Sequence, residues 1–460
     1  MIECIRQENA AYLAGSYDFQ TESAYHFSIA EFIFRKESCS GRHDGETMKS
    51  LTLRYSAIQF SYWAATTGAS AFAAAYLLER NIPSAAVGAV LAAAGVLSCI
   101  AQPFLAAAQD REQAPVLSQV LIKMSALCCL CFALQLLPGL PLFAVGFCYM
   151  AGVFCASTMQ PLLNALCVAS NQAGYPVNYG AARGAGAAAS ALATLFLGAS
   201  IERLGVQSLP VFVLALRALS MLMLAGYPVI RRTMVLSAPH KRCSVTAFIL
   251  RYRWYCASLC GIALLGMFHA RTDNYLIAIL QRLGGGSSHV GTALFISSLS
   301  AAPVIFFFST IRKHARDTTL LKIAAVSFLL KSAGFCLVRR VEAVYLLQLL
   351  QMTSYALLAP AEVEYAGARV RQEDMVKGQA LITAAYALGC SAGNFAGGQL
   401  LSFGVSALLE AGVGMALAGT VVIFLTADRQ DASITEQNRD VFRTSREEGN
   451  RHEQCENHLP

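Results

Sequence analysis

Charged side chains are scarce in this sequence, and their scarcity excludes most classes of soluble protein. Asp, Glu, Lys and Arg make up 14% of the 460 residues, whereas soluble domains carry about 25%. Hydrophobic residues make up 56% and the mean hydropathy is +0.49. Apolar runs of about 20 residues recur along the chain. The composition therefore predicts an all-α polytopic membrane protein that lies in a lipid bilayer.

Motifs of soluble catalysis are also missing. No lysine follows a glycine, which excludes the Gly-Lys-Ser/Thr phosphate-binding loop, and no HExxH pattern occurs. The run Gly389-Cys-Ser391-Ala-Gly393 matches the nucleophile elbow in letters only, because it lies inside an apolar run and not between a strand and a helix. We therefore expect no enzyme, no catalytic residue and no cofactor.

The cysteines and the net charge have ordinary explanations in a membrane protein. The 15 cysteines lie mainly in apolar runs, which argues against a disulfide framework. Cys128, Cys129 and Cys131 would point in different directions from a helix, so we expect no metal site. The net charge of +7 comes mostly from short loops, where it sets membrane topology and does not indicate nucleic-acid binding.

Twelve segments are long enough to span a bilayer as helices. They cover residues 56–78, 84–108, 115–137, 140–164, 179–201, 208–230, 254–281, 287–311, 318–338, 343–366, 375–402 and 404–426. The pattern predicts two pseudo-symmetric six-helix bundles, 48–230 and 254–426, joined by a cytoplasmic linker at 231–253.

Both ends of the chain are polar and lack long apolar runs. Residues 1–47 carry no signal-peptide pattern, and we expect a disordered extension or an over-long gene model. Residues 427–460 are expected to form a disordered cytoplasmic tail. One face of the predicted topology carries most of the loop cations, while the other carries Arg80, Arg203, Arg282, Arg339 and Arg340. The positive-inside rule then places both termini in the cytoplasm of a multi-pass plasma-membrane protein, which we expect to be a monomer.

The two predicted bundles look like copies of one another. Pro161, Gly180, Gly198 and Gly205 have counterparts displaced by about 199 residues, namely Pro360, Gly378, Gly397 and Gly404. Parallel six-helix repeats are typical of one large class of transporters, in which the substrate site lies at midplane between the halves.

Particular motifs resemble one transporter family. Gln102-Pro103 followed by Asp110 and Arg111 is similar to the loop between the second and third helices of the major facilitator superfamily, although Ala106 replaces the usual glycine. The run from Tyr179 to Gly186 resembles the start of the fifth helix in the branch with lactose permease, nucleoside:proton symporters and phenylpropionate permeases. The resemblance implies alternating access to a small-molecule site, with Asp110 and Arg111 in a gating loop.

Several titratable residues that the resemblance leads one to expect are replaced by neutral residues in this sequence. Gln351 and Ser354 align with positions where lactose permease has its coupling histidine and glutamate, and Ala301 aligns with a glutamate of the eighth helix. Asn164 lies near the glutamate that pairs with the fifth-helix arginine. Proton coupling in this chain must therefore use other groups.

The segment Gly266–Gly286 offers such groups, because His269, Arg271 and Asp273 lie in a predicted span. A charge at the centre of a membrane helix costs about 3 kcal/mol, so such residues face a partner or a cavity. We predict Asp273 as the proton site and His269 as a relay, with Lys331 or Arg271 as the cation that controls the protonation of Asp273. A static ion pair that holds the helix is the alternative.

Other polar residues in the spans are candidates for substrate binding. Arg183 offers a fork of donors for hydroxyl or carboxylate groups, although it could also snorkel to lipid headgroups. The complete set of candidates is Arg183, Asn274, Gln348, Gln351, Tyr355 and Asn394. The sequence thus predicts proton-coupled uptake of a saccharide, nucleoside or aromatic acid. Efflux, an uncoupled facilitator and a non-transporting sensor are the alternatives.

Overall fold

A computed structural model of the chain describes residues 42–109, 115–230, 245–371 and 374–429. All regular structure in these ranges is helical, which confirms the predicted all-α class. Nine of the described helices are long and apolar enough to cross a membrane. Three further helices of spanning length, α3, α11 and α18, are not among these nine. The count of twelve spans therefore remains a prediction with which the helix order agrees.

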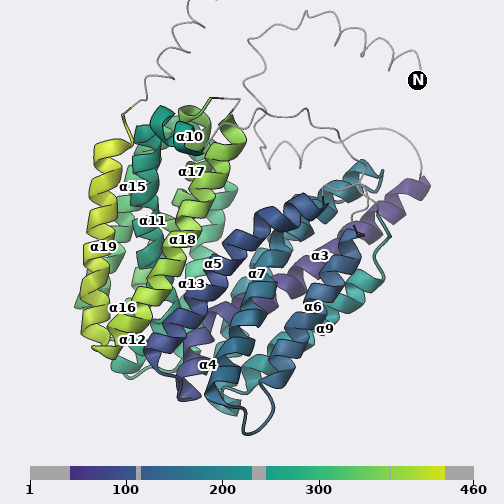
Figure 1. Cartoon of the computed structure of the whole chain (residues 1–460), viewed down its shortest axis with the longest axis horizontal. Coiled ribbons are helices and arrows are strands. Elements are labelled where there is room, and N and C mark those ends of the chain that lie inside the picture. The colour runs from purple at the N-terminus through teal and green to yellow at the C-terminus, as the bar shows by residue number, and fades with distance from the viewer. Residues whose placement is uncertain (1–41, 110–114, 231–244, 372–373, 430–460) are drawn as a thin grey trace, which may run out of the picture. The chain divides into compact units, whose positions relative to one another are not determined.

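The first half of the described chain contains seven helices in six successive rods (Figure 1). They are α3 (Arg42–Ala71) continued by α4 (Ala73–Glu79), α5 (Ser84–Gln109), α6 (Leu117–Leu134), α7 (Leu142–Gln172), α8 (Tyr179–Leu204) and α9 (Ser208–Ala225). The sharp turn after α8 uses Gly205 with φ +83°, a left-handed conformation that glycine adopts without a steric penalty.

The second half contains a short helix and six rods, of which three are interrupted. They are α10 (Val245–Arg251), α11 (Arg253–Asn274) with α12 (Leu276–Arg282), α13 (Ser287–Phe306) with α14 (Phe308–His314), α15 (Asp317–Leu337), α16 (Val341–Gln348) with η1 (Leu349–Met352) and α17 (Tyr355–Arg369), α18 (Met375–Ser402) and α19 (Val405–Thr426).

Element boundaries differ from the sequence prediction mainly at the edges of the halves. Helix α3 begins at Arg42, so the last residues of the expected 1–47 extension are helical. The expected linker 231–253 contains helix α10, which places Phe248 against the ring of Tyr252. Residues 1–41, 231–244 and 430–460, on which the other expectations for the termini and linker rest, lie outside the described ranges. The domain boundaries themselves remain predictions.

Buried tyrosines connect the helices within each half. Tyr55, Tyr62 and Tyr149 donate to backbone carbonyls of neighbouring helices at 2.9, 2.8 and 2.6 Å, and Tyr255 donates to the carbonyl of Gly378 at 2.7 Å. In hydrocarbon, helix association depends on packing and on such interhelical hydrogen bonds, because apolar side chains gain little by leaving lipid.

Glycines bring the two halves into backbone contact. A Cβ added to Gly88 of α5 would lie 2.7 Å from the carbonyl of Asn394 in α18, and one added to Gly198 of α8 would lie 2.6 Å from the carbonyl of Ser287. Only glycine allows helices to approach so closely. The Glu202 carboxylate also accepts from the Ser288 amide at 2.6 Å. Gly88 lies near the start of α5, which follows α4, and Ser287 begins α13, which follows α12. Helices α4 and α12 lie at the same end of the helices (Figure 1).

Candidate functional site

Four of the predicted residues form one connected polar cluster in the second half. Lys331 Nζ of α15 donates to Gln351 Oε1 of η1 at 2.7 Å, and Gln351 Nε2 lies 3.0 Å from His269 Nε2 of α11. Asp273, one helical turn beyond His269, places Oδ2 3.2 Å from the same ring nitrogen and Oδ1 3.9 Å from Lys331 Nζ. The sequence spacing correctly predicted that His269 and Asp273 share a helix face.

The hydrogen bonds within the cluster depend on whether Nε2 of His269 carries a proton. A lysine ammonium can only donate, so the Gln351 carbonyl must face Lys331 and the Gln351 amide must face His269. A bare Nε2 accepts from Gln351 but repels an ionised Asp273, whereas a protonated Nε2 binds Asp273 and repels the amide. The position of a proton at Nε2 therefore decides which of the two neighbours His269 binds.

Aromatic side chains fix the imidazole of His269. Tyr355 stacks on it with ring centroids 4.9 Å apart and planes 14° apart, and Phe328 meets it edge-on at 5.7 Å. The Tyr386 hydroxyl lies 2.7 Å from Nδ1. Tyr355, a predicted site residue, therefore contacts His269, and so does Tyr386, which the sequence reasoning missed. Tyr386 and Asn394 are eight residues apart in α18 and so lie on one side of that helix. This spacing from the predicted Asn394 is the feature of the sequence that could have identified Tyr386.

Burial divides the ion pair into an enclosed cation and an accessible anion. The Lys331 side chain is 1% exposed, whereas that of Asp273 is 22% exposed. Asp273 Oδ1 accepts no hydrogen bond from any described residue. The oxygen of Asp273 that faces Lys331 is thus enclosed, and the exposed part of the side chain lies elsewhere on the carboxylate.

The helix that carries Gln351 is interrupted. A 3-10 turn, Leu349–Met352, separates α16 from α17, and Ser354 has φ −90° and ψ −96°. Gln348 and Ser354 are fully buried, and within the described ranges neither the Gln348 amide nor the Ser354 hydroxyl has a hydrogen-bond partner. Each buried orphan group costs about 1–3 kcal/mol. Gln348, predicted as a substrate ligand, is enclosed and lies outside the connected cluster. It lies at an interruption of the helix, and interrupted helices line the sites of many transporters.

Asn274 and Asn394 bind each other. The Asn274 amide donates to Asn394 Oδ1 at 2.6 Å, and the Tyr275 hydroxyl donates to the Asn394 carbonyl at 3.1 Å. This pair joins α11 to α18. Each amide retains unused donors or acceptors beyond this contact, and a role of the pair in solute binding remains a prediction.

Arg183 belongs to the first half and is separate from the charged cluster. Its guanidinium lies 4.1 Å from the centroid of the Trp63 ring, and the Trp63 indole donates to Gln59 Oε1 at 3.0 Å. Asn164 accepts from Tyr179 at 3.2 Å. Stacking on an indole leaves the five N–H donors of Arg183 at the ring edge, where they can bind a solute.

Two other buried arginines point elsewhere. Arg271 is two residues from Asp273 but does not join its cluster, since its guanidinium packs where a side chain at Gly412 would be. Arg217 donates to Thr66 at 2.6 Å and lies 4.8 Å from the Tyr62 ring. The gating candidates Asp110 and Arg111 lie outside the described residues.

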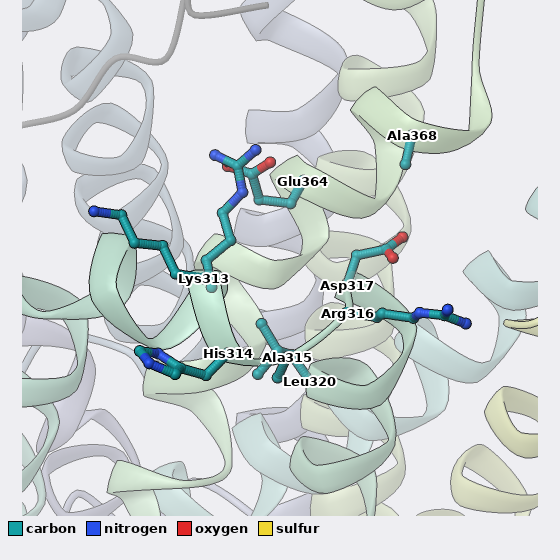
Figure 2. Close-up of a pocket in the computed structure, with 9 residues that line it drawn as sticks. Lys313, His314, Ala315, Arg316, Asp317, Leu320, Glu364 and Ala368 are labelled. Carbon is teal, nitrogen blue, oxygen red and sulfur yellow. The ribbon is translucent and has the colours of Figure 1, made fainter.

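A separate pocket of about 430 Å³ lies where α14 meets α15 (Figure 2). Its lining is Arg312, Lys313, His314, Ala315, Arg316, Asp317, Leu320, Glu364 and Ala368. Arg312 and Glu364 form an ion pair at 3.0 Å. The pocket contains no residue of the His269 cluster. Its cations belong to the loop charge from which the sequence predicts the cytoplasmic side. In the described ranges, His, Cys, Asp and Glu form no group that could hold a metal ion.

One family model and several solved transporter structures match this chain. The family model described as "MFS_1 like family" matches residues 52–408. The structure is similar to the nucleoside transporter NupG, with TM-score 0.69, 15% identity, and coverage of 83% of this chain and 98% of that one.

Two further solved structures are similar to this chain. An auto inhibited POT family peptide transporter gives TM-score 0.61, 12% identity, and coverage of 84% and 97%. A bacterial homolog of the human lysosomal transporter Spinster, in an inward-facing and occupied conformation, gives TM-score 0.56 and 12% identity, with coverage of 87% of this chain and 98% of that one. At such low identities, the TM-scores and coverages show a shared fold alone. Comparison with curated protein sequences finds no match.

Proposed function

This chain belongs to the MFS_1 like family of the major facilitator superfamily, and we propose that it is a proton-coupled secondary transporter for a small polar organic solute. The observation that carries the proposal is the cluster of Lys331, Gln351, His269 and Asp273. A static ion pair would need only the two charges. Here an imidazole and an amide are added in an arrangement whose contacts change with a single proton.

Asp273 is the proton site in this proposal. When protonated it loses its attraction to Lys331, and when ionised it regains a cation 3.9 Å away. Because Lys331 lies on α15 and Gln351 on the interrupted tenth rod, the loss or gain of this attraction acts on three helices at once. Protonation from one side and release to the other would then drive the exchange between the two access states.

The two halves offer complementary surfaces to a solute. Arg183 and Trp63 in the first half supply donors and an aromatic face, and Tyr355 in the second supplies another aromatic face beside Asp273. A planar base that carries a polar ribose would use both kinds of group. We therefore propose nucleosides as the first substrate class to test, ahead of saccharides and aromatic acids; the solved transporter NupG, named for nucleosides, supports this order.

The loop charges and the glycine contacts support a proposal about the orientation of the chain and its described conformation. The glycine contacts between Gly88 and α18 and between Gly198 and α13 close the end of the helices that the loop charges assign to the outside. We propose that the described conformation is closed outward, in a plasma-membrane protein with cytoplasmic termini that imports its solute. Efflux is the alternative, and the same binding site would serve it.

The test is uptake into proteoliposomes of labelled uridine, lactose and phenylpropionate, with and without an inward proton gradient. The proposal predicts accumulation above equilibrium only with the gradient, and its loss in Asp273→Asn. Gradient-independent equilibration would instead favour an uncoupled facilitator, for which the Asp273–Lys331 pair is only a structural contact. Binding of a solute without flux across the membrane would favour a non-transporting sensor.

A further inference from the structure

The indole of Trp63 lies between two polar side chains of the first half. The guanidinium carbon of Arg183 in α8 lies 4.1 Å from the centroid of the ring, and the indole N–H donates to Gln59 Oε1 at 3.0 Å. The indole is partly exposed, whereas Gln59 is 2% exposed. Trp63 thus connects a buried amide to an arginine that is a predicted substrate ligand.

A series of hydrogen bonds that all run in one direction fixes the amide of Gln59. An indole N–H can only donate, so the Gln59 carbonyl oxygen faces Trp63 and its amide nitrogen faces Tyr55. Gln59 Nε2 donates to the Tyr55 hydroxyl at 2.7 Å, and that hydroxyl donates to the backbone carbonyl of Leu163 in α7 at 2.9 Å. Tyr55, Gln59 and Trp63 follow one another at intervals of four residues in α3, so they share one face of that helix. The indole is therefore tied to the backbone of a second helix.

The helix that carries Arg183 also sets the position of the indole edge. A Cβ added to Gly186 of α8 would lie 2.5 Å from Cδ1 of Trp63, a separation that real side chains do not adopt. A Cβ added to Gly184, two residues earlier, would meet no neighbouring group within 4 Å. The close approach at Gly186 thus decides where the indole lies relative to α8 and to Arg183.

The ring of Trp63 limits where the guanidinium of Arg183 can lie. None of the ion pairs between described residues includes Arg183. Its N–H donors form a rigid fork that suits two neighbouring oxygen atoms. A guanidinium that stacks on a fixed ring presents this fork to a solute from a fixed place.

We propose that Gln59 and Gly186 are positioning residues, which fix the indole of Trp63 and through it the fork of Arg183, so that the fork binds two neighbouring hydroxyls of the solute. This inference rests on the proposed function. Within the proposed nucleoside class, it assigns the fork to the ribose, whose 2′- and 3′-hydroxyls are adjacent. A site built to hydrogen-bond a hydroxyl rejects the analogue that lacks it, because its own donors are then left unpaired. A ribonucleoside should therefore bind more tightly than the 2′-deoxynucleoside.

The first test needs no solute. The chain has two tryptophans, so in a Trp254→Phe background the tryptophan band in the near-ultraviolet circular dichroism spectrum comes from Trp63 alone. Gln59→Met removes the acceptor of the indole N–H, and Gly186→Ala adds a methyl group where the ring lies. Both variants should change the band. Gly184→Ala is the matched control, because it makes the same chemical change in the same helix without a contact, and it should leave the band as it is. A band that is the same in all four proteins would overturn the inference.

The second test measures the binding of uridine and of 2′-deoxyuridine to the purified proteins. The unmodified protein and Gly184→Ala should bind uridine about tenfold more tightly than 2′-deoxyuridine, the scale of one hydrogen bond from a charged donor. In Gln59→Met and Gly186→Ala this ratio should fall toward one, whereas a general loss of structure would weaken the binding of both nucleosides and leave the ratio unchanged. A ratio that both variants retain, or that the unmodified protein lacks, would contradict the inference.

Failure of the proposed function gives a different result. If the unmodified protein binds neither nucleoside, the proposed substrate class is wrong. The near-ultraviolet band then still decides whether Gln59 and Gly186 position the ring of Trp63.

Discussion

The pair formed by Lys331 and Asp273 gives the sharpest test of the charged cluster. Replacement of Lys331 by Met removes an enclosed cation, so that Asp273 loses the lysine ammonium with which it pairs. Two unit charges 3.9 Å apart attract by about 4 kcal/mol at an effective dielectric constant of about 20. Since Asp273 is 22% exposed, water screens part of this, and we expect a coupling free energy of about 2–3 kcal/mol.

A double-mutant cycle measures this coupling. The free energy of unfolding is determined in detergent for the unmodified protein, Lys331→Met, Asp273→Asn and the double variant. Each single variant should lose stability, and the double variant should recover most of the loss, because no charge is then left without its partner. The control is Glu364→Gln in place of Asp273→Asn, which should add to Lys331→Met without coupling. Additive losses for Lys331 and Asp273 would refute the interaction.

Three further predictions concern other parts of the molecule. Trp63→Leu should weaken solute binding about tenfold, because the stacked Arg183 loses an interaction of about 1–2 kcal/mol, and a binding isotherm checks this; an unchanged affinity would show that Arg183 does not depend on the ring. Gly398→Val should separate α18 from α5, because helix α5 occupies the space of the new side chain. A cysteine placed at that end of the two helices should then react faster with a maleimide. The hydrogen bond from Lys322 holds the pKa of Asp428, beyond the last span, below its usual value; its stabilising effect should be present at pH 7 and be lost as the pH falls below about 4, so that Asp428→Asn and the unmodified protein melt further apart at pH 7 than at pH 3.

Part of the site followed from the sequence. The spacing of four between His269 and Asp273 placed them on one face of a helix, and the cost of a membrane charge indicated that Lys331 and Asp273 would have partners. The same spacing rule separated Arg271 from Asp273, and in the structure that guanidinium packs against Gly412. Such inferences succeed because they depend only on local helix geometry and on the energetics of charge in lipid.

Other parts of the site could not be anticipated. The sequence predicts Gln351 as a neutral replacement in a coupling position and as a substrate-binding candidate, but it does not predict that the Gln351 amide lies between Lys331 and His269. Tyr386 received no prediction, although its hydroxyl contacts the imidazole. Both residues come from helices distant in sequence, and a single sequence carries no record of which faces of two such helices meet.

The sequence by itself determined the fold class and the order of the helices. In lipid, each apolar span must satisfy its own backbone hydrogen bonds, so it forms a helix whose length matches the bilayer. The break in the tenth rod, the crossing of Gly88 with α18, and the contact of Gly186 with the ring of Trp63 required the assembled molecule. Those features depend on how helices remote in sequence pack against one another, and in a membrane that packing is decided by small residues and single hydrogen bonds whose partners the sequence does not name.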